Sequence, residues 1–150
     1  MKRVCFLMMA FLLTLALVGC GGSKVNNNVT ADGLVGALYN TVKFDSEMKS
    51  VSVDNYLTLP EGAQAAGRMS NGTTAEEIIV VRCANENDAK TVKTGIESFL
   101  ADQRVNMERY QPQEVARMDN AVLTQRGVYV VLCVSADSEM AEKIIKEQLG

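Results

Sequence analysis

Apolar residues recur at helical spacing in three segments of the chain after residue 30. These segments span 31–44, 89–103 and 138–149. Side chains three and four positions apart lie on one face of a helix, so each segment predicts a helix with one buried face. Polar residues suited to capping precede each of them, namely Thr30 or Asp32, the run 85–88, and Asp137.

Other segments follow the pattern of strands. Consecutive apolar residues, many of them β-branched, occupy 77–84 and 128–135, which favours strands in the middle of a sheet. A strand over 120–125 is joined to the second of these around Arg126 and Gly127. The segment 65–70 precedes an Asn-Gly pair typical of hairpins and predicts a short edge strand.

Two remaining segments are less regular. Residues 46–62 contain short β-leaning pieces at 51–53 and 56–59, and we expect irregular structure there. Pro112 suits the first position of a short helix that ends near Met118. In this interpretation Gln111 is the cap, Glu114 is the third helical residue, and Tyr110 packs on Val115 as a hydrophobic staple.

The order of these elements predicts a single α+β domain over residues 31–150. We expect a small mixed or antiparallel sheet with helices packed on it. The strands at 78–81 and 128–134 should be central and covered by helices on at least one face and partly on the other.

The first residues have the layout of an export signal. Lys2 and Arg3 give a positive start, and an apolar run of 15 residues follows from Val4 to Val18. A membrane-spanning helix needs about 20 apolar residues, so an uncleaved anchor is the weaker alternative. We therefore predict a cleaved signal peptide over residues 1–19.

The sequence Leu17-Val18-Gly19-Cys20 resembles the lipobox of bacterial lipoprotein precursors. This resemblance implies cleavage between Gly19 and Cys20 and acylation of Cys20, with chains such as palmitate. Two acyl chains give stable anchoring, whereas one gives only marginal binding. The expected location is the cell membrane, lipid-anchored on its extracytoplasmic face. Ordinary secretion with cleavage nearby is the alternative, and residues 20–30, rich in Gly and Asn, indicate a flexible linker.

Composition removes several function classes. The chain has 15 basic and 18 acidic residues, a formal net charge of -3, which argues against nucleic acid as a partner. It contains no His, which excludes Ser-His, Cys-His and His-ligated metal mechanisms. We expect no cofactor, no metal site and no catalytic residue.

Two short motifs match a known enzyme class only superficially. Ser46 to Lys49 matches S-x-x-K, and Lys93 to Gly95 matches the K-T-G of penicillin-binding acyltransferases. That triplet falls within a predicted helix instead of a strand, so the pair is interpreted as coincidence. No calcium-loop spacing is present among the acidic residues of the first half, which we interpret as a solvated face: Asp45, Glu47, Asp54, Glu61, Glu76 and Glu77.

Cysteine and tyrosine give two further predictions. Once Cys5 is removed and Cys20 lipidated, Cys83 and Cys133 remain, each late in an apolar strand. Buried free thiols are the preferred interpretation, and a disulfide between neighbouring strands is the alternative. The few aromatic residues are expected to serve as core and staple residues, including Tyr39, Tyr110 and Tyr129.

Several short segments, which together span most of the exported domain, resemble a family of Gram-positive lipoproteins described as the domain of unknown function DUF4358. They are 44–48, 75–80, 87–89, 110–115, 120–122, 127–130 and 134–137. The resemblance implies location and fold and brings no catalytic residue with it. The expected function is a non-catalytic binding or accessory role in the cell envelope, with a protein partner of unknown identity. The alternative is a small ligand-binding or hydrolytic lipoprotein with a pocket over the sheet.

Overall fold

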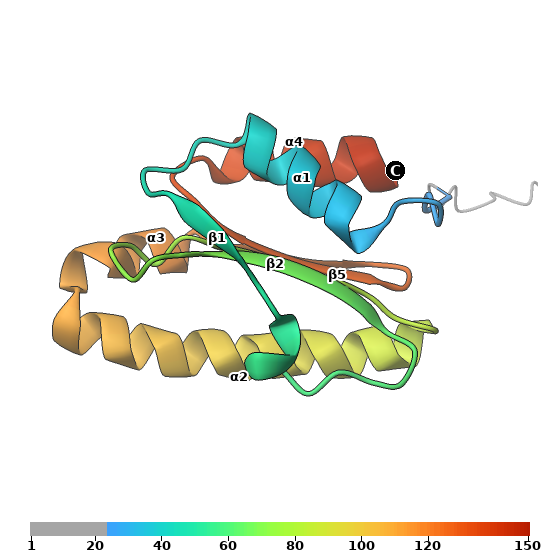
Figure 1. Ribbon diagram of the computed structural model, residues 1–150, viewed down its shortest axis with the longest axis horizontal. Helices are drawn as coiled ribbons and strands as arrows, with labels where there is room; N and C mark the ends of the chain where they lie inside the picture. The colour runs from blue at the N-terminus through green and yellow to red at the C-terminus, as the bar shows by residue number, and fades with distance from the viewer. Residues whose placement is uncertain (1–23) are drawn as a thin grey trace, which may run out of the picture.

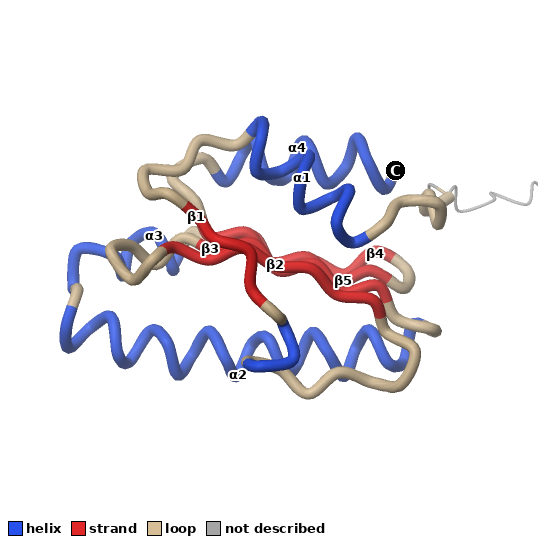
Figure 2. The backbone as a smooth tube through the Cα atoms, viewed as in Figure 1, coloured by secondary structure: helices blue, strands red, loops and turns tan. Residues whose placement is uncertain are grey.

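Five strands form one antiparallel sheet in the order β1-β2-β3-β5-β4 in the computed structural model, which describes residues 24–150 (Figures 1 and 2). The strands are β1 (Met48–Val51), β2 (Gln64–Ser70), β3 (Glu77–Arg82), β4 (Val122–Arg126) and β5 (Tyr129–Val134). All neighbouring pairs are antiparallel. The predicted α+β class is therefore confirmed, with the antiparallel of the two expected sheet types.

Helices cover both faces of the sheet. The helices α1 (Ala31–Thr41) and α4 (Ser138–Leu149) lie side by side on one face, and the long helix α2 (Glu86–Tyr110) crosses the other (Figure 1). A 3-10 turn, η2 (Pro112–Glu114), leads into the short α3 (Val115–Asp119). A second 3-10 turn, η1 (Val53–Asn55), follows β1.

The predicted caps begin the three main helices. The side chains of Thr30, Asn85 and Asp137 accept hydrogen bonds from the backbone N–H groups of Gly33, Asp88 and Met140. Each bond satisfies a donor that the first helical turn leaves without an internal partner. The first helix ends at Thr41, three residues before the predicted end at 44.

Apolar side chains form one core on each side of the sheet. The core under α1 and α4 contains Ile78 and Val80 from β3, while the core under α2 contains Ile79 and Val81. Every residue of β5 is buried. The alternation of side chains along each strand fills both cores at once, which confirms that β3 and β5 are the central strands.

The prediction that 65–70 forms an edge strand is wrong. This segment is β2, and it lies between β3 and β1. The strand β1 belongs to residues 46–62, which were expected to be irregular. The four residues of β1 include only one fully buried side chain, that of Met48, so they lack the alternation that marks a strand. Close packing also identifies β2 as an interior strand, because a Cβ at Gly67 would lie 3.1 to 3.2 Å from Val51, Val53 and Ile78.

The predicted staple of Tyr110 on Val115 is also wrong. Tyr110 is 71% exposed and belongs to the last turn of α2. Pro112 does begin a helical turn, but that turn is 3-10, and Gln111 makes no side-chain cap for it. The amide of Gln111 instead donates to the carbonyl oxygen of Gly72 at 3.0 Å.

Residues 24–30, the described part of the predicted linker, contact the domain. The backbone N–H of Asn26 donates to the carbonyl of Leu149 at 2.8 Å, and the hydroxyl of Tyr129 donates to the carbonyl of Val29 at 2.8 Å. The predicted signal peptide, Gly19 and Cys20 lie outside the described residues. Among residues 24–150, no helix is both long enough and apolar enough to span a membrane.

Candidate functional site

Two consecutive glutamates are buried: Glu76, directly before β3, and Glu77, its first residue. Glu76 is 1% and Glu77 is 2% exposed, so the prediction that both belong to a solvated face is wrong. Because side chains alternate along a strand, Glu76 faces the side of α1 and α4, whereas Glu77 faces α2. Buried carboxylates need partners or protonation, and these two residues satisfy that need in different ways.

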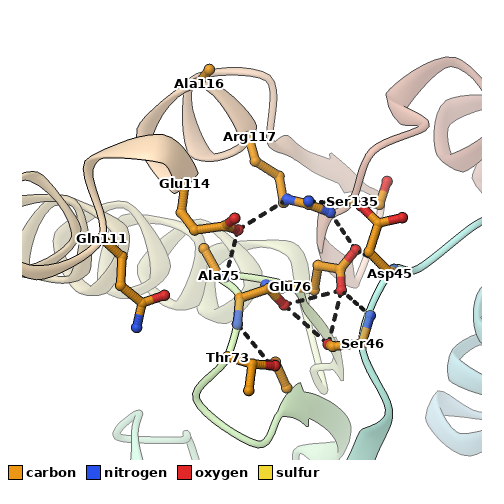
Figure 3. A network of polar contacts seen from close by, with 12 residues as sticks. Asp45, Ser46, Thr73, Ala75, Glu76, Gln111, Glu114, Ala116, Arg117 and Ser135 are labelled. Carbon is orange, nitrogen blue, oxygen red and sulfur yellow. Dashed lines mark hydrogen bonds and ion pairs between the residues drawn. The ribbon is translucent and has the colours of Figure 1, made fainter.

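Glu76 is surrounded by donors from two loops and a helix (Figure 3). One carboxylate oxygen accepts from the backbone N–H of Asp45 at 2.8 Å. The other accepts from the N–H of Ser46 at 2.9 Å, the hydroxyl of Ser46 at 2.9 Å and the hydroxyl of Thr74 at 3.0 Å. The guanidinium of Arg117 completes the set. Five donors therefore occupy the carboxylate.

Arg117 links three carboxylates, and we call Asp45, Glu76, Glu114 and Arg117 the Arg117 cluster. Besides its bond to Glu76, Arg117 donates to Asp45 at 2.8 Å and pairs through Nε with Glu114 at 3.1 Å. Burial works against its charge, but the hydrogen bond to Asp45 and the attraction of the carboxylates give Arg117 a raised pKa. The hydrogen bond from Arg117 is also the main reason that the pKa of Asp45 is lowered.

The Arg117 cluster holds together segments that are far apart in the sequence. Glu114 accepts from the backbone N–H of Ala75 at 2.9 Å, which ties η2 to the loop between β2 and β3. Glu76 ties the same loop to the segment before β1 through Asp45 and Ser46. A planar guanidinium with several donors suits this bridging role better than a lysine ammonium.

Glu77 lies against a small cavity on the α2 side of the sheet, which we call the Glu77 cavity. One of its oxygens accepts from the amide of Gln103 at 3.3 Å, and the other has no partner among the described residues. The cavity has a volume of about 150 Å³ and is lined in part by Met69, Thr74 and Met107. Burial raises the pKa of Glu77 to about 7, although the hydrogen bond from Gln103 works in the opposite direction. This carboxyl therefore changes its charge near neutral pH.

Larger open depressions lie elsewhere on the surface of residues 24–150. One, of about 440 Å³, adjoins Arg117 and is lined by polar residues such as Asn120, Ser135 and Ser138. Another, of about 640 Å³, runs between β4 and α4, and we call it the β4–α4 groove. It combines the apolar side chains of Val122 and Ile145 with charged residues of α4.

The residues of the superficial acyltransferase match have other partners. Ser46 is a donor to Glu76, and Lys49 is exposed on β1. Lys93 lies in the interior of α2, as predicted for the K-T-G triplet, and pairs with Glu97 one turn further on. Within residues 24–150, no group of three His, Cys, Asp or Glu side chains is placed to hold a metal ion.

The two described cysteines are free and buried, as preferred from the sequence. Cys83 belongs to the core under α2 and Cys133 to the core under α1 and α4. The sheet therefore separates the two thiols. Burial raises the pKa of both, that of Cys133 to about 12. Among the tyrosines expected to be core or staple residues, Tyr129 is fully buried and Tyr39 packs against the core, whereas Tyr110 is exposed.

Sequence reasoning missed the Arg117 cluster and the Glu77 cavity. The only local signal was the placement of two glutamates directly before four apolar β-branched residues. Their partners, Arg117 and Gln103, lie 41 and 26 residues further along the chain. Such pairings follow from the fold and not from a local pattern.

Comparison with known proteins identifies one family. The model of the family described as a domain of unknown function (DUF4358) matches residues 61–135, which include Glu76, Glu77, Glu114 and Arg117. No curated protein and no solved structure matches the chain.

Proposed function

The chain belongs to the DUF4358 family, and from this premise we propose that it is a membrane-anchored lipoprotein on the extracytoplasmic face. Its domain has a non-catalytic binding or accessory role in the cell envelope. Cys20 carries the lipid in this proposal, and residues 1–19 are the signal peptide.

The sequence before the described residues supports the anchor. A positive start, an apolar run too short for an ordinary membrane span and the lipobox Leu17–Cys20 occur in the expected order. Two acyl chains on Cys20 would hold the protein stably at the membrane.

The observation that carries the non-catalytic role is the engagement of Glu76. A general base needs a free lone pair aimed at a substrate proton, and a nucleophilic serine needs an adjacent base. Here five internal donors occupy the Glu76 carboxylate, and Ser46 is itself one of those donors. These polar side chains stabilise the loops at the end of the sheet and are not available for catalysis. We therefore favour a role in which the surface of the domain binds a partner.

The alternative, a small ligand-binding or hydrolytic lipoprotein, is supported by the Glu77 cavity. This cavity lies over the sheet on the α2 side, and one carboxylate oxygen has no partner among the described residues. Its volume of about 150 Å³ suits only a very small ligand or a few water molecules. Native mass spectrometry of protein purified from its own cells tests this alternative. A bound small molecule present in wild type and absent from Glu77→Gln would move the alternative ahead.

The anchor is tested by replacing Cys20 with serine. We expect wild-type protein in the membrane fraction with incorporated labelled palmitate, and Cys20→Ser protein without label and outside that fraction. Cys5→Ser is the matched control, because it alters a cysteine within the apolar run and should leave labelling unchanged. Labelled Cys20→Ser protein at the membrane would contradict the anchor.

A further inference from the structure

The strand β4 is an edge strand with an open outer side. Within the described residues it pairs with β5 alone. The two-residue turn at Gly127 makes Arg126 and Tyr129 a hydrogen-bonded pair, so alternate residues of β4 direct their backbone groups outward. The outward groups are those of Leu123 and Gln125. Free backbone groups on a regular edge are a template for pairing with another strand.

The opposite edge of the sheet is less suited to pairing. There β1 has only four residues, two of which are the exposed Lys49 and Ser50, and the chain turns into η1 almost immediately afterwards (Figure 1). Short length and an exposed lysine are common devices that protect an edge strand. In contrast, β4 contains neither proline nor lysine and pairs regularly over all five residues.

The charges beside β4 point to a particular occupant. The helix α4 runs parallel to β4. It begins near the Val122 end of β4, where β5 ends. At the opposite end of β4, Arg126 donates to the carbonyl of Gly150, just after α4, at 2.8 Å. In the β4–α4 groove, Glu139 and Glu142 lie in the first half of α4, and Lys143 and Lys146 follow them. A segment with acidic and basic halves is complementary to an antiparallel copy of itself.

A buried donor at one end of the groove adds a second observation. The Nε atom of Arg126 is buried and has no hydrogen-bond partner within residues 24–150. An antiparallel copy of β4 would place the Val122 end of the second chain beside Arg126. The start of the second α4, with Glu139, would then lie beside the same guanidinium, and turning the Arg126 side chain toward the new interface would give its unpartnered Nε a carboxylate acceptor.

We propose that two copies of this protein associate through antiparallel pairing of their β4 strands, with Thr124 on the twofold axis. Centring at Thr124 pairs all five residues of each strand and places Leu123 of one copy opposite Gln125 of the other. The two sheets join into one of ten strands, and the β4–α4 groove of each copy faces the α4 helix of the other.

The spacing of the layers is compatible with this arrangement. The helix α4 packs over β4 and β5, about half a strand spacing inside the edge. Across a new strand pair about 4.8 Å apart, the two α4 axes would lie about 10 Å from each other, which is the usual distance between packed helices. A twofold axis normal to the sheet also leaves residues 24–30 of both copies on the same face. The inference goes beyond the proposed envelope role and does not depend on lipidation.

Cysteine crosslinking of full-length protein in intact cells tests the pairing. Residues facing each other at a non-hydrogen-bonded position have Cα atoms about 4.5 Å apart, which a disulfide can bridge. We expect Thr124→Cys to give a covalent homodimer under mild oxidation. Ser50→Cys, an exposed position on the other edge strand, is the matched control and should stay monomeric. The native Cys83 and Cys133 are buried and should not contribute.

A charge exchange tests the orientation. Adding Glu139→Arg to Thr124→Cys should lower the crosslinked fraction by about fivefold, because two symmetry-related ion pairs are lost. Adding Arg126→Glu as well should restore the crosslinked fraction. Three results would overturn the proposal: no homodimer with Thr124→Cys, equal crosslinking with Ser50→Cys, or crosslinking of Thr124→Cys to a different protein. Wild-type protein treated in the same way shows whether Cys20 forms a crosslink when it is not lipidated, so that only crosslinking above the wild-type level is assigned to Thr124→Cys.

Discussion

Glu77 shows what a single buried carboxyl does to the domain. Its raised pKa means that the folded protein keeps a proton which the unfolded chain has already released. Between about pH 4.5 and 7 the folded state therefore binds more protons than the unfolded state, and stability falls as pH rises. The chain contains no His, so no histidine titrates in this window.

Replacing Glu77 with glutamine should remove this pH dependence. We expect wild type to lose up to roughly 3 kcal/mol of unfolding free energy between pH 4.5 and 8, and Glu77→Gln to lose much less. Urea denaturation across this range measures the effect. Glu47→Gln, at an exposed position, should behave like wild type. Equal slopes in wild type and Glu77→Gln would show that Glu77 is ionised at both ends of the range.

The two described thiols should be protected by burial and separated by the sheet. We expect a thiol reagent to leave Cys83 and Cys133 unmodified in the folded domain and to modify both after unfolding without reductant. Intact mass measurement counts the modified groups. A protein two hydrogens lighter that resists modification after unfolding would reveal a disulfide.

Ser46 should be chemically inert. Its hydroxyl donates to the buried carboxylate of Glu76, and the side chain of Lys49 is exposed on β1. We expect a labelled penicillin not to acylate the protein. Labelling of wild type that disappears in Ser46→Ala would contradict the structural role of this residue and favour an enzyme.

At the scale of elements, the Arg117 cluster joins α3, the β2–β3 loop and the segment before β1. Removing the guanidinium would leave the buried Glu76 and the nearly buried Glu114 without their cation. We expect Arg117→Met to lower the unfolding free energy by about 3 kcal/mol or more, measured by urea denaturation. Arg117→Lys should lose less, because it keeps the charge but not the planar fork.

Arg104 provides the matched control for this prediction. It also pairs with two acidic residues, Glu108 and Asp119, but all three side chains are substantially exposed. We expect Arg104→Met to lower the unfolding free energy far less than Arg117→Met does, since exposed ion pairs contribute little. Equal losses for Arg104→Met and Arg117→Met would show that the cluster does not fasten the loops.

The sequence predicted those helices and strands that are marked by an apolar pattern or a capping residue of their own. The apolar runs of β3 and β5 and the capping residues Asn85 and Asp137 are such signals, and the structure confirms them. The strand β1 was missed because its placement depends on pairing with β2 and not on its own alternation. The burial of Glu76 and Glu77 was missed for a related reason, since their partners come from distant segments.

At the scale of the whole molecule, the domain and the proposed anchor have separate roles. The sheet with its two helical layers accounts for residues 31–150, and residues 24–30 contact this domain, with Asn26 bonded to Leu149. The proposed lipid on Cys20 lies only four residues before this segment. Anchoring would hold the domain close to the membrane and raise the local concentration of copies that can meet through β4.

Mass spectrometry of the N-terminal peptide of the mature protein, purified from its own cells, tests the lipoprotein proposal most directly. We expect a peptide that begins at Cys20 and carries a diacylglyceryl group on the thiol. A peptide that retains residues from 1–19, or one that begins after cleavage elsewhere and carries no lipid, would contradict the proposal.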